Sequence, residues 1–179
     1  YLDELKDVIF VSLTNKVINN PNNIISAGIN ANSQLKTIKK FKKLNEIKKT
    51  IFLIPKENYK EEIEKAIKQS KIKTKEVFYY DSDPTKLTKQ IEEITKYYQR
   101  KQNLEDEIKR LKNSDEINKQ KKIKALKKLD TLGKVNFDSI IISDFDESLK
   151  SITTSLLYTD ISPKKIHFIT LNQWFDESL

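Results

Sequence analysis

Short apolar segments alternate with longer amphipathic segments along most of this chain. The short segments are rich in Ile, Val and Phe and end at polar or turn residues, which is typical of buried β-strands. The longer segments repeat apolar residues every three or four positions, as one face of a helix does. The expected strands are residues 8–13, 24–28, 50–54, 77–80, 139–143 and 166–171, and the expected helices are 33–44, 58–67, 85–132 and 144–157.

Capping residues mark where three of these helices should begin. Asp83 followed by Pro84 supplies an N-cap and a first-turn proline for the helix that follows. Asn58, with Glu61 three residues on, resembles a capping box. Asp144 has the same spacing to Glu147, so the last helix is expected to open at Asp144.

The alternation of strands and helices predicts an α/β fold. Consecutive strands joined by helices pair in parallel through right-handed crossovers, with helices on both faces of the sheet. We therefore expect a three-layer, doubly wound and mainly parallel sheet. Residues 85–132 interrupt it with nearly continuous helix that Asn113 and Ser114 should break into a long hairpin.

Composition limits the size and class of the protein. With 179 residues, of which 37% are hydrophobic, the chain can build one domain, or one lobe and part of another. The sequence contains no Met, so we expect it to be a segment of a longer protein. It has no apolar run of ~20 residues and no signal-peptide pattern, so we expect no membrane span within it. The absence of Cys excludes disulfides, thiol catalysis and Cys-based zinc sites.

A net charge of +8 raises the question of a nucleic-acid partner. Only Arg100 and Arg110 are arginines, although bidentate recognition of phosphates and guanine edges favours Arg. Residues 85–132 contain 14 basic and 8 acidic residues, so a net +6 lies on the helical insertion. The abundance of Lys, Ile and Asn is typical of an AT-rich genome, and we expect no nucleic-acid partner.

Ligands of such sheets bind beyond the carboxyl ends of the strands, so the residues just past each strand are the candidate site. Hydroxyls, amides and an aromatic ring there suit the polar group of a ligand, although helix caps, turns and packing explain several of them equally well. The candidate ligand-binding residues are Ser12, Thr14, Asn15, Asn58, Tyr59, Asp144 and Asp146, and Asp81, Asn172 and Trp174 occupy similar positions.

Catalysis is not expected from these residues. Asp144, Asp146 and Glu147 could serve as general acids or bases or bind a hard cation, but a helix N-terminus stabilises carboxylates without either role. His167 is the only histidine and lies in an apolar strand pattern, which predicts a packed or edge-exposed residue. Two glycines in the whole chain cannot build a phosphate-binding loop. No enzyme activity, cofactor or metal is therefore predicted.

Four stretches of the chain carry a combined pattern of strands, turns and helices. They are VIFVSLTNK with NIISAGINANSQLKTI (8–16 and 23–38), KKTIFLIPKENYKEEIEKAI (48–67), the charged helical insertion (85–132) and residues 136–179. The last stretch is the most specific, with a strand, an acidic turn, a helix, a linker, a strand and then Trp followed by an acidic residue. Together these stretches resemble the bacterial penicillin-binding protein activator family of outer-membrane lipoproteins.

This resemblance implies a lobe of the type I periplasmic-binding-protein fold. Residues 1–23 would then end a first lobe and cross the hinge, and residues 24–179 would form the second lobe with the insertion at 85–132. The family implies a non-enzymatic protein of the bacterial envelope, periplasmic and outer-membrane-associated, that binds and regulates a peptidoglycan synthase, a class A penicillin-binding protein. Its lipid anchor would lie outside this chain, which contains no Cys.

The alternative function is that of a periplasmic solute-binding receptor of an ABC-type transporter. Its ligand would be an amino acid or a similar small polar molecule, held by residues such as Ser12, Thr14, Tyr59 and Asp144. A receptor with ligand at about 100 times its Kd should gain about 2.7 kcal/mol of stability, whereas a protein-binding module should gain none from small molecules.

Overall fold

The computed structural model describes residues 8–12, 24–26, 29–57 and 60–171. The chain divides into two units, one containing residues 1–47 and 59–73 and the other containing residues 48–58 and 74–179. Each unit is described separately below. In the described part of the chain, no helix combines the length and the apolar character needed to cross a membrane.

The first unit contains two short strands and two helices. Strands β1 (Phe10–Ser12) and β2 (Ile24–Ser26) pair in parallel, with Phe10 opposite Ile24. Helix α1 (Ala31–Leu44) begins where the Asn30 side chain accepts a hydrogen bond from the Ser33 N–H at 2.9 Å. Both strands and this helix lie within the predicted segments, but Val11, Phe41 and Leu44 of the apolar pattern are 61%, 41% and 83% exposed.

Helix α2 (Lys60–Ser70) packs against α1. Two lysines of α1 reach the chain where α2 ends: Lys39 Nζ donates to the Ser70 carbonyl at 3.2 Å and Lys42 Nζ to the Lys73 carbonyl at 2.6 Å. Lys42 is buried, and burial lowers the pKa of its ammonium group. Lys39 therefore satisfies a carbonyl that the helix end leaves without a partner inside the helix, and Lys42 binds the chain just beyond it.

The second unit is built on a four-stranded sheet in which every neighbouring pair is parallel. The strand order is β4-β3-β5-β6, so the predicted parallel α/β sheet is confirmed. The two central strands are buried along their whole length because their residues are apolar on both faces. The strands are β3 (Thr50–Pro55), β4 (Glu76–Tyr80), β5 (Ser139–Ile142) and β6 (His167–Thr170).

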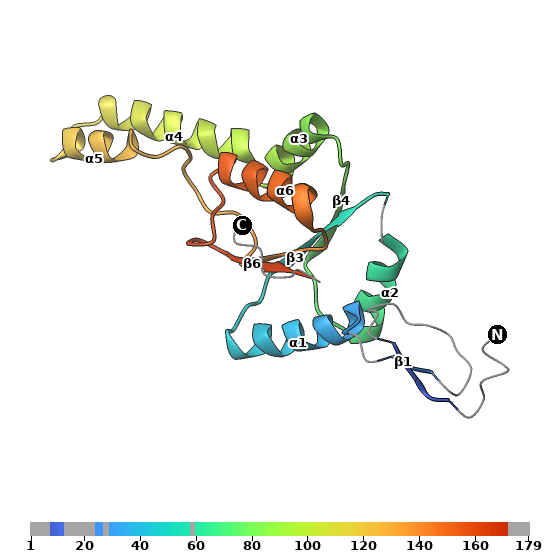
Figure 1. Cartoon of the computed structure of the whole chain (residues 1–179). Coiled ribbons are helices and arrows are strands. Elements are labelled where there is room, and N and C mark those ends of the chain that lie inside the picture. Colours follow the sequence, from blue (N-terminus) through green and yellow to red (C-terminus); the bar gives the residue numbers. More distant parts are fainter. Residues whose placement is uncertain (1–7, 13–23, 27–28, 58–59, 172–179) are drawn as a thin grey trace. The chain divides into compact units, whose positions relative to one another are not determined.

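Helices α3 (Pro84–Ile94) and α6 (Asp146–Tyr158) lie side by side over one face of this sheet (Figure 1). The predicted start of α3 is confirmed, since the Asp83 carboxylate accepts from Thr85 N and Lys86 N at 3.0 and 3.1 Å. The core beneath the two helices consists of Ile51, Leu53, Tyr80, Leu87, Ile91, Phe137, Ile140, Ile142, Leu149, Ile152, Leu156, Ile161 and Ile166.

The segment between β4 and β5 holds three helices, although the sequence predicts nearly continuous helix with one break. The break expected after residue 112 is present, because α4 (Tyr97–Lys112) and α5 (Lys119–Leu126) are separate helices that contact each other. A second break lies at Lys96, whose φ is 52°. It shifts the helical register, so Tyr97 is buried, whereas Tyr98, which would continue the apolar stripe of Leu87, Ile91 and Ile94 in an unbroken helix, is 63% exposed.

Left-handed backbone marks the helix ends throughout the described residues. Six non-glycine residues have φ between 50° and 68°, each at or next to the beginning or end of a helix. Glycine is the usual residue at such positions because it has no Cβ to clash with the backbone. The six residues are Glu46, Lys71, Lys96, Asn118, Asp146 and Asp160.

Helix α6 begins two residues later than the sequence predicts. Phe145 is its N-cap residue and Asp146 its first residue, so the expected capping box from Asp144 to Glu147 is wrong. The Asp144 carboxylate is engaged on the sheet side instead, as described below. His167, predicted to be either a packed or an edge-exposed strand residue, is exposed at the start of the edge strand β6.

Truncation of Ile140 tests the importance of the central strand pair. Ile140 lies in β5 and is 0% exposed, whereas Ile117 lies between α4 and α5 and is 87% exposed. We expect Ile140→Ala to lower the free energy of unfolding by about 2–5 kcal/mol, because a buried cavity replaces the side chain. Ile117→Ala, the same chemical change, should stay within about 0.5 kcal/mol of the parent in urea unfolding. Equal losses in the two variants would contradict this core.

Candidate functional site

The centre of the sheet is the point at which a ligand site is expected. In the strand order β4-β3-β5-β6, the chain goes from β3 outward to β4 at one edge of the sheet, and from β5 outward to β6 at the opposite edge. In parallel sheets the crevice at such a reversal, beyond the carboxyl ends of the strands, is the usual binding position. Here Lys56 follows β3, Asp81 follows β4, and Ser143 and Asp144 follow β5.

Asp144 forms the centre of a buried polar cluster at this edge. It is 9% exposed, and its Oδ2 accepts a hydrogen bond from the hydroxyl of Tyr80, which is 1% exposed. Its Oδ1 accepts from the Phe145 N–H at 2.9 Å. Both carboxylate oxygens therefore hold local structure together, and the Tyr80 bond joins the ends of β4 and β5.

The surroundings of Tyr80 keep its hydroxyl protonated. Burial raises the pKa of Tyr80 far above its usual value near 10, and the hydrogen bond to Asp144 and the negative charge of that residue raise it further. The neighbouring Ser143 hydroxyl donates to the Leu53 carbonyl at 2.9 Å, so it is also occupied within the sheet. The polar groups of this cluster act as structural links between strands.

The other predicted site residues are only partly described. Asp146 is exposed at the first turn of α6, and Ser12 is the last residue of β1, with nothing described of its side chain. The structure thus brings Asp144 next to Tyr80 but does not bring Asp144 and Asp146 into one site. The predicted residues outside the described part are Thr14, Asn15, Asn58, Tyr59, Asn172 and Trp174.

The other two acidic residues considered from the sequence, Asp81 and Glu147, bind residues close to them in the chain. The Asp81 carboxylate accepts from Asp83 N at 3.1 Å and pairs with Lys86 at 3.4 Å, and the backbone hydrogen bond is the main cause of its lowered pKa. Glu147 pairs with Lys150 at 3.0 Å. Within the described residues, no group of three or more acidic or histidine side chains is arranged to hold a metal ion.

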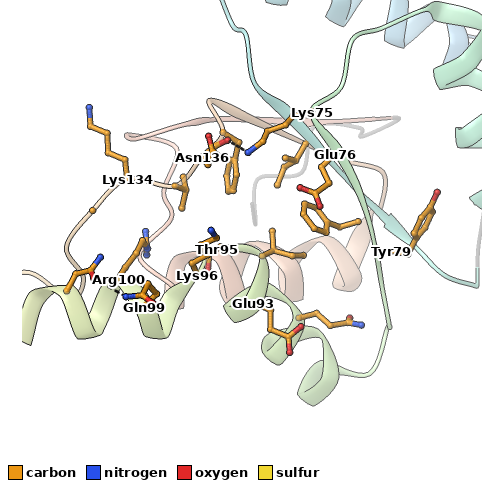
Figure 2. Close-up of a pocket in the computed structure, with 18 residues that line it drawn as sticks. Lys75, Glu76, Tyr79, Glu93, Thr95, Lys96, Gln99, Arg100, Lys134 and Asn136 are labelled. Carbon is orange, nitrogen blue, oxygen red and sulfur yellow. Dashed lines mark hydrogen bonds between the residues drawn. The ribbon is translucent and has the colours of Figure 1, made fainter.

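A cleft lies on the α3-bearing side of the sheet, toward the amino ends of β3 and β4 (Figure 2). Its volume is about 680 Å³, within the range of small-molecule sites. It is formed by four segments of the chain: Ile51 of β3, β4 with the residue before it, the end of α3 with the beginning of α4, and the chain leading into β5. The lining residues are Ile51, Lys75, Glu76, Phe78, Tyr79, Gln90, Glu93, Ile94, Thr95, Lys96, Gln99, Arg100, Asn103, Gly133, Lys134, Val135, Asn136 and Phe137.

Arg100 is the most unusual residue of this cleft. It is 5% exposed, and its Nη2 donates to the Thr159 carbonyl at the end of α6. Its buried Nε has no hydrogen-bond partner among the described residues. Burial lowers the pKa of the guanidinium, and the charge of Asp160 partly offsets this effect. Arginine remains charged in proteins, so a buried charge and a buried unpaired donor occur together.

Arg100 was not predicted as a binding-site residue, although its position in the sequence indicates a buried charge. Arg100 lies four residues before Leu104 and three after Tyr97, on the stripe that α4 buries. A basic residue on an apolar stripe is a candidate for a buried charge with a specific partner. Tyr80 carried no comparable signal, because its partner Asp144 is 64 positions away.

Comparisons with protein-family models, with curated proteins and with solved structures give no match to this chain.

The pH dependence of stability tests the Tyr80–Asp144 bond. An unfolded chain releases the Tyr80 proton at its usual pKa near 10, whereas the folded chain retains it because the pKa is raised. The contribution of Tyr80 to stability is therefore complete below about pH 10 and declines above it, by up to about 1.4 kcal/mol per pH unit.

In Tyr80→Phe, urea unfolding should show a shallower decline above about pH 10 than the parent chain. At neutral pH the same variant should lose about 1–3 kcal/mol, because Asp144 Oδ2 is left buried without its donor. Identical slopes for the two proteins would show that the folded Tyr80 hydroxyl ionises freely.

Proposed function

We propose that this chain is a non-catalytic binding module of the bacterial envelope that binds and regulates a peptidoglycan synthase, as penicillin-binding protein activators do. In this proposal it is a three-layer lobe of the type I periplasmic-binding-protein kind, anchored by a lipid outside the chain. The partner is a class A penicillin-binding protein, and the helical insertion between β4 and β5 is the surface that contacts it.

The sheet supports this proposal in two ways. Four parallel strands with α3 and α6 over one face are compatible with such a lobe. At the carboxyl edge, Asp144, Ser143 and Asp81 are all engaged in structural hydrogen bonds. These engaged groups favour a scaffold role for this edge over the alternative of a small polar solute bound there.

The charge on α5 is the observation that carries the proposal. Residues 119–128 contain six lysines and no acidic residue. Among the described residues, only Lys122 of these six forms an ion pair, with Glu116 at 2.7 Å, and Lys119 donates to the Ser114 carbonyl. Unpaired lysines on a projecting helix are suited to an acidic protein surface, which they attract over long distances and release at high salt.

The insertion is also held firmly at its base. The Leu132 N–H donates to the Arg100 carbonyl at 2.9 Å, which ties the returning chain to α4. Arg110 bridges Glu107 and Glu116 at 2.8 Å each, which orders the turn between α4 and α5. A surface that is ordered before binding loses less entropy when a partner docks.

A charge-reversal experiment tests the proposal. The variant Lys121→Glu, Lys124→Glu, Lys128→Glu should weaken binding to the class A penicillin-binding protein of the same organism at least tenfold in surface plasmon resonance, because attraction becomes repulsion. All three lysines are exposed. Binding of the parent chain should also weaken as salt rises.

The matched control reverses three exposed lysines on α1, Lys36, Lys40 and Lys43. It changes the net charge by the same amount on a helix of the first unit that is not part of the proposed contact surface, and it should leave the affinity within about twofold. Equal losses in the two triple variants would indicate a non-specific charge effect. Absence of binding by the parent chain would overturn the proposed function.

A further inference from the structure

We propose that the cleft beside Arg100 binds a small organic anion with an aromatic or branched apolar body. This site is lined mainly by residues toward the amino ends of the strands, although Tyr79 and Gln90 extend it to the end of β4. It is independent of the proposed contact between α5 and a protein partner.

The apolar part of the ligand follows from the floor of the cleft. Phe78, Ile94, Val135 and Phe137 line it and belong to the core of the sheet or pack against that core. Apolar side chains at the base of a cleft gain from covering a hydrophobic surface, so a purely inorganic anion would leave most of this surface in water. The volume of about 680 Å³ accommodates a single aromatic ring with a short side chain.

The charge of the lining residues indicates an anion. Four cations line the cleft, and Glu76 and Glu93 are the two acidic residues. The ends of Lys134 and Glu93 point outward in Figure 2, which leaves Lys75, Lys96 and Arg100 against Glu76. The net charge is +2 with or without the outward pair. Among the described residues, none of these charged groups pairs with another in a salt bridge.

Arg100 supplies the specific observation. Arg100 is one of the residues that line the cleft. Its Nη2 donates to the Thr159 carbonyl, which fixes the guanidinium, and its buried Nε has no acceptor in the part of the chain that the structure describes. A buried charged donor without an acceptor is unfavourable, and native structures pair such groups with protein, water or a ligand. A carboxylate in the cleft would supply both an acceptor and a compensating charge.

The backbone around the cleft leaves room for this ligand. Helix α4 begins there with no acidic residue in its first turn and no side-chain cap from the described residues. Gly133 lies beside Arg100 and has a φ of 113°, and a Cβ at this position would be 3.8 Å from Asn103 and 4.0 Å from Arg100, which are ordinary contact distances. The positive φ, not a lack of space, therefore favours glycine at this position of the cleft lining.

Titration with three probes tests the proposal on the full 179-residue chain labelled with nitrogen-15. The probes are 4-phenylbutyrate, which has an apolar body and a carboxylate, 4-phenylbutylamine, which has the same body and the opposite charge, and acetate. At constant ionic strength, 4-phenylbutyrate should cause saturable amide shifts in residues 95–100 and 133–137. The amine and acetate should bind at least tenfold more weakly.

Variants with matched controls assign the binding to Arg100. Arg100→Met should weaken 4-phenylbutyrate binding about tenfold or more, the scale of a lost charge-assisted hydrogen bond. Arg110→Met, on the same helix but away from the cleft, should leave it unchanged. Arg100 also donates a hydrogen bond to the Thr159 carbonyl, so its replacement could disturb the fold, and a second variant at an exposed residue is needed. Lys96→Gln should weaken 4-phenylbutyrate binding severalfold, and Lys109→Gln is its control.

Equal binding of the amine and the carboxylate would overturn the proposal, since it would indicate an apolar groove without selectivity for charge. So would shifts confined to residues outside the cleft, or equal losses in Lys96→Gln and Lys109→Gln. Failure of the peptidoglycan synthase to bind would leave this site unaffected, because its evidence comes from the cleft alone.

Discussion

The pairing of β3 with β5 is the interaction on which the second unit depends. It joins segments that are far apart in the sequence, since Thr50 and Ser139 are 89 positions apart and their buried hydroxyls lie 2.8 Å from each other. At the entrance to the pair, Asp138 Oδ2 accepts from Lys48 N and Lys49 N at 3.2 and 2.9 Å. Without this pairing the sheet would separate into two-stranded ribbons, which are marginal in water.

The same pairing determines where the functional features can lie. Because β4 and β5 flank β3, the chain must cross the sheet between them, and the crossing segment carries α3, α4 and α5. α4 contributes Arg100 to the cleft near its beginning and contacts α5 toward its other end. One helix therefore connects the cleft, the proposed site for a small anion, with the basic surface that is proposed to contact a protein partner.

The sequence predicted the structural features that depend on neighbouring residues. It did not predict those that depend on contacts between residues far apart in the sequence. Apolar runs predicted all four strands of the parallel sheet, and the Asp83–Pro84 pair predicted the start of α3. The start of α6 was misplaced because the Asp144 carboxylate binds Tyr80, a partner that no local pattern identifies. The break at Lys96 was not predicted because neither Gly nor Pro marks it. The cleft was not predicted because its lining comes from four separate segments of the chain.

The left-handed residues at the helix ends have a consequence for how this protein could change. Side chains at positions such as Glu46, Lys71 and Asp160 hold a backbone conformation that costs roughly 1–2 kcal/mol relative to the right-handed one. A chain with two glycines accepts this cost repeatedly. The scarcity of glycine at these left-handed positions therefore lowers the free energy of unfolding, independently of how well the core packs. Replacing single residues at these helix ends by glycine would raise the stability of the protein without altering its core.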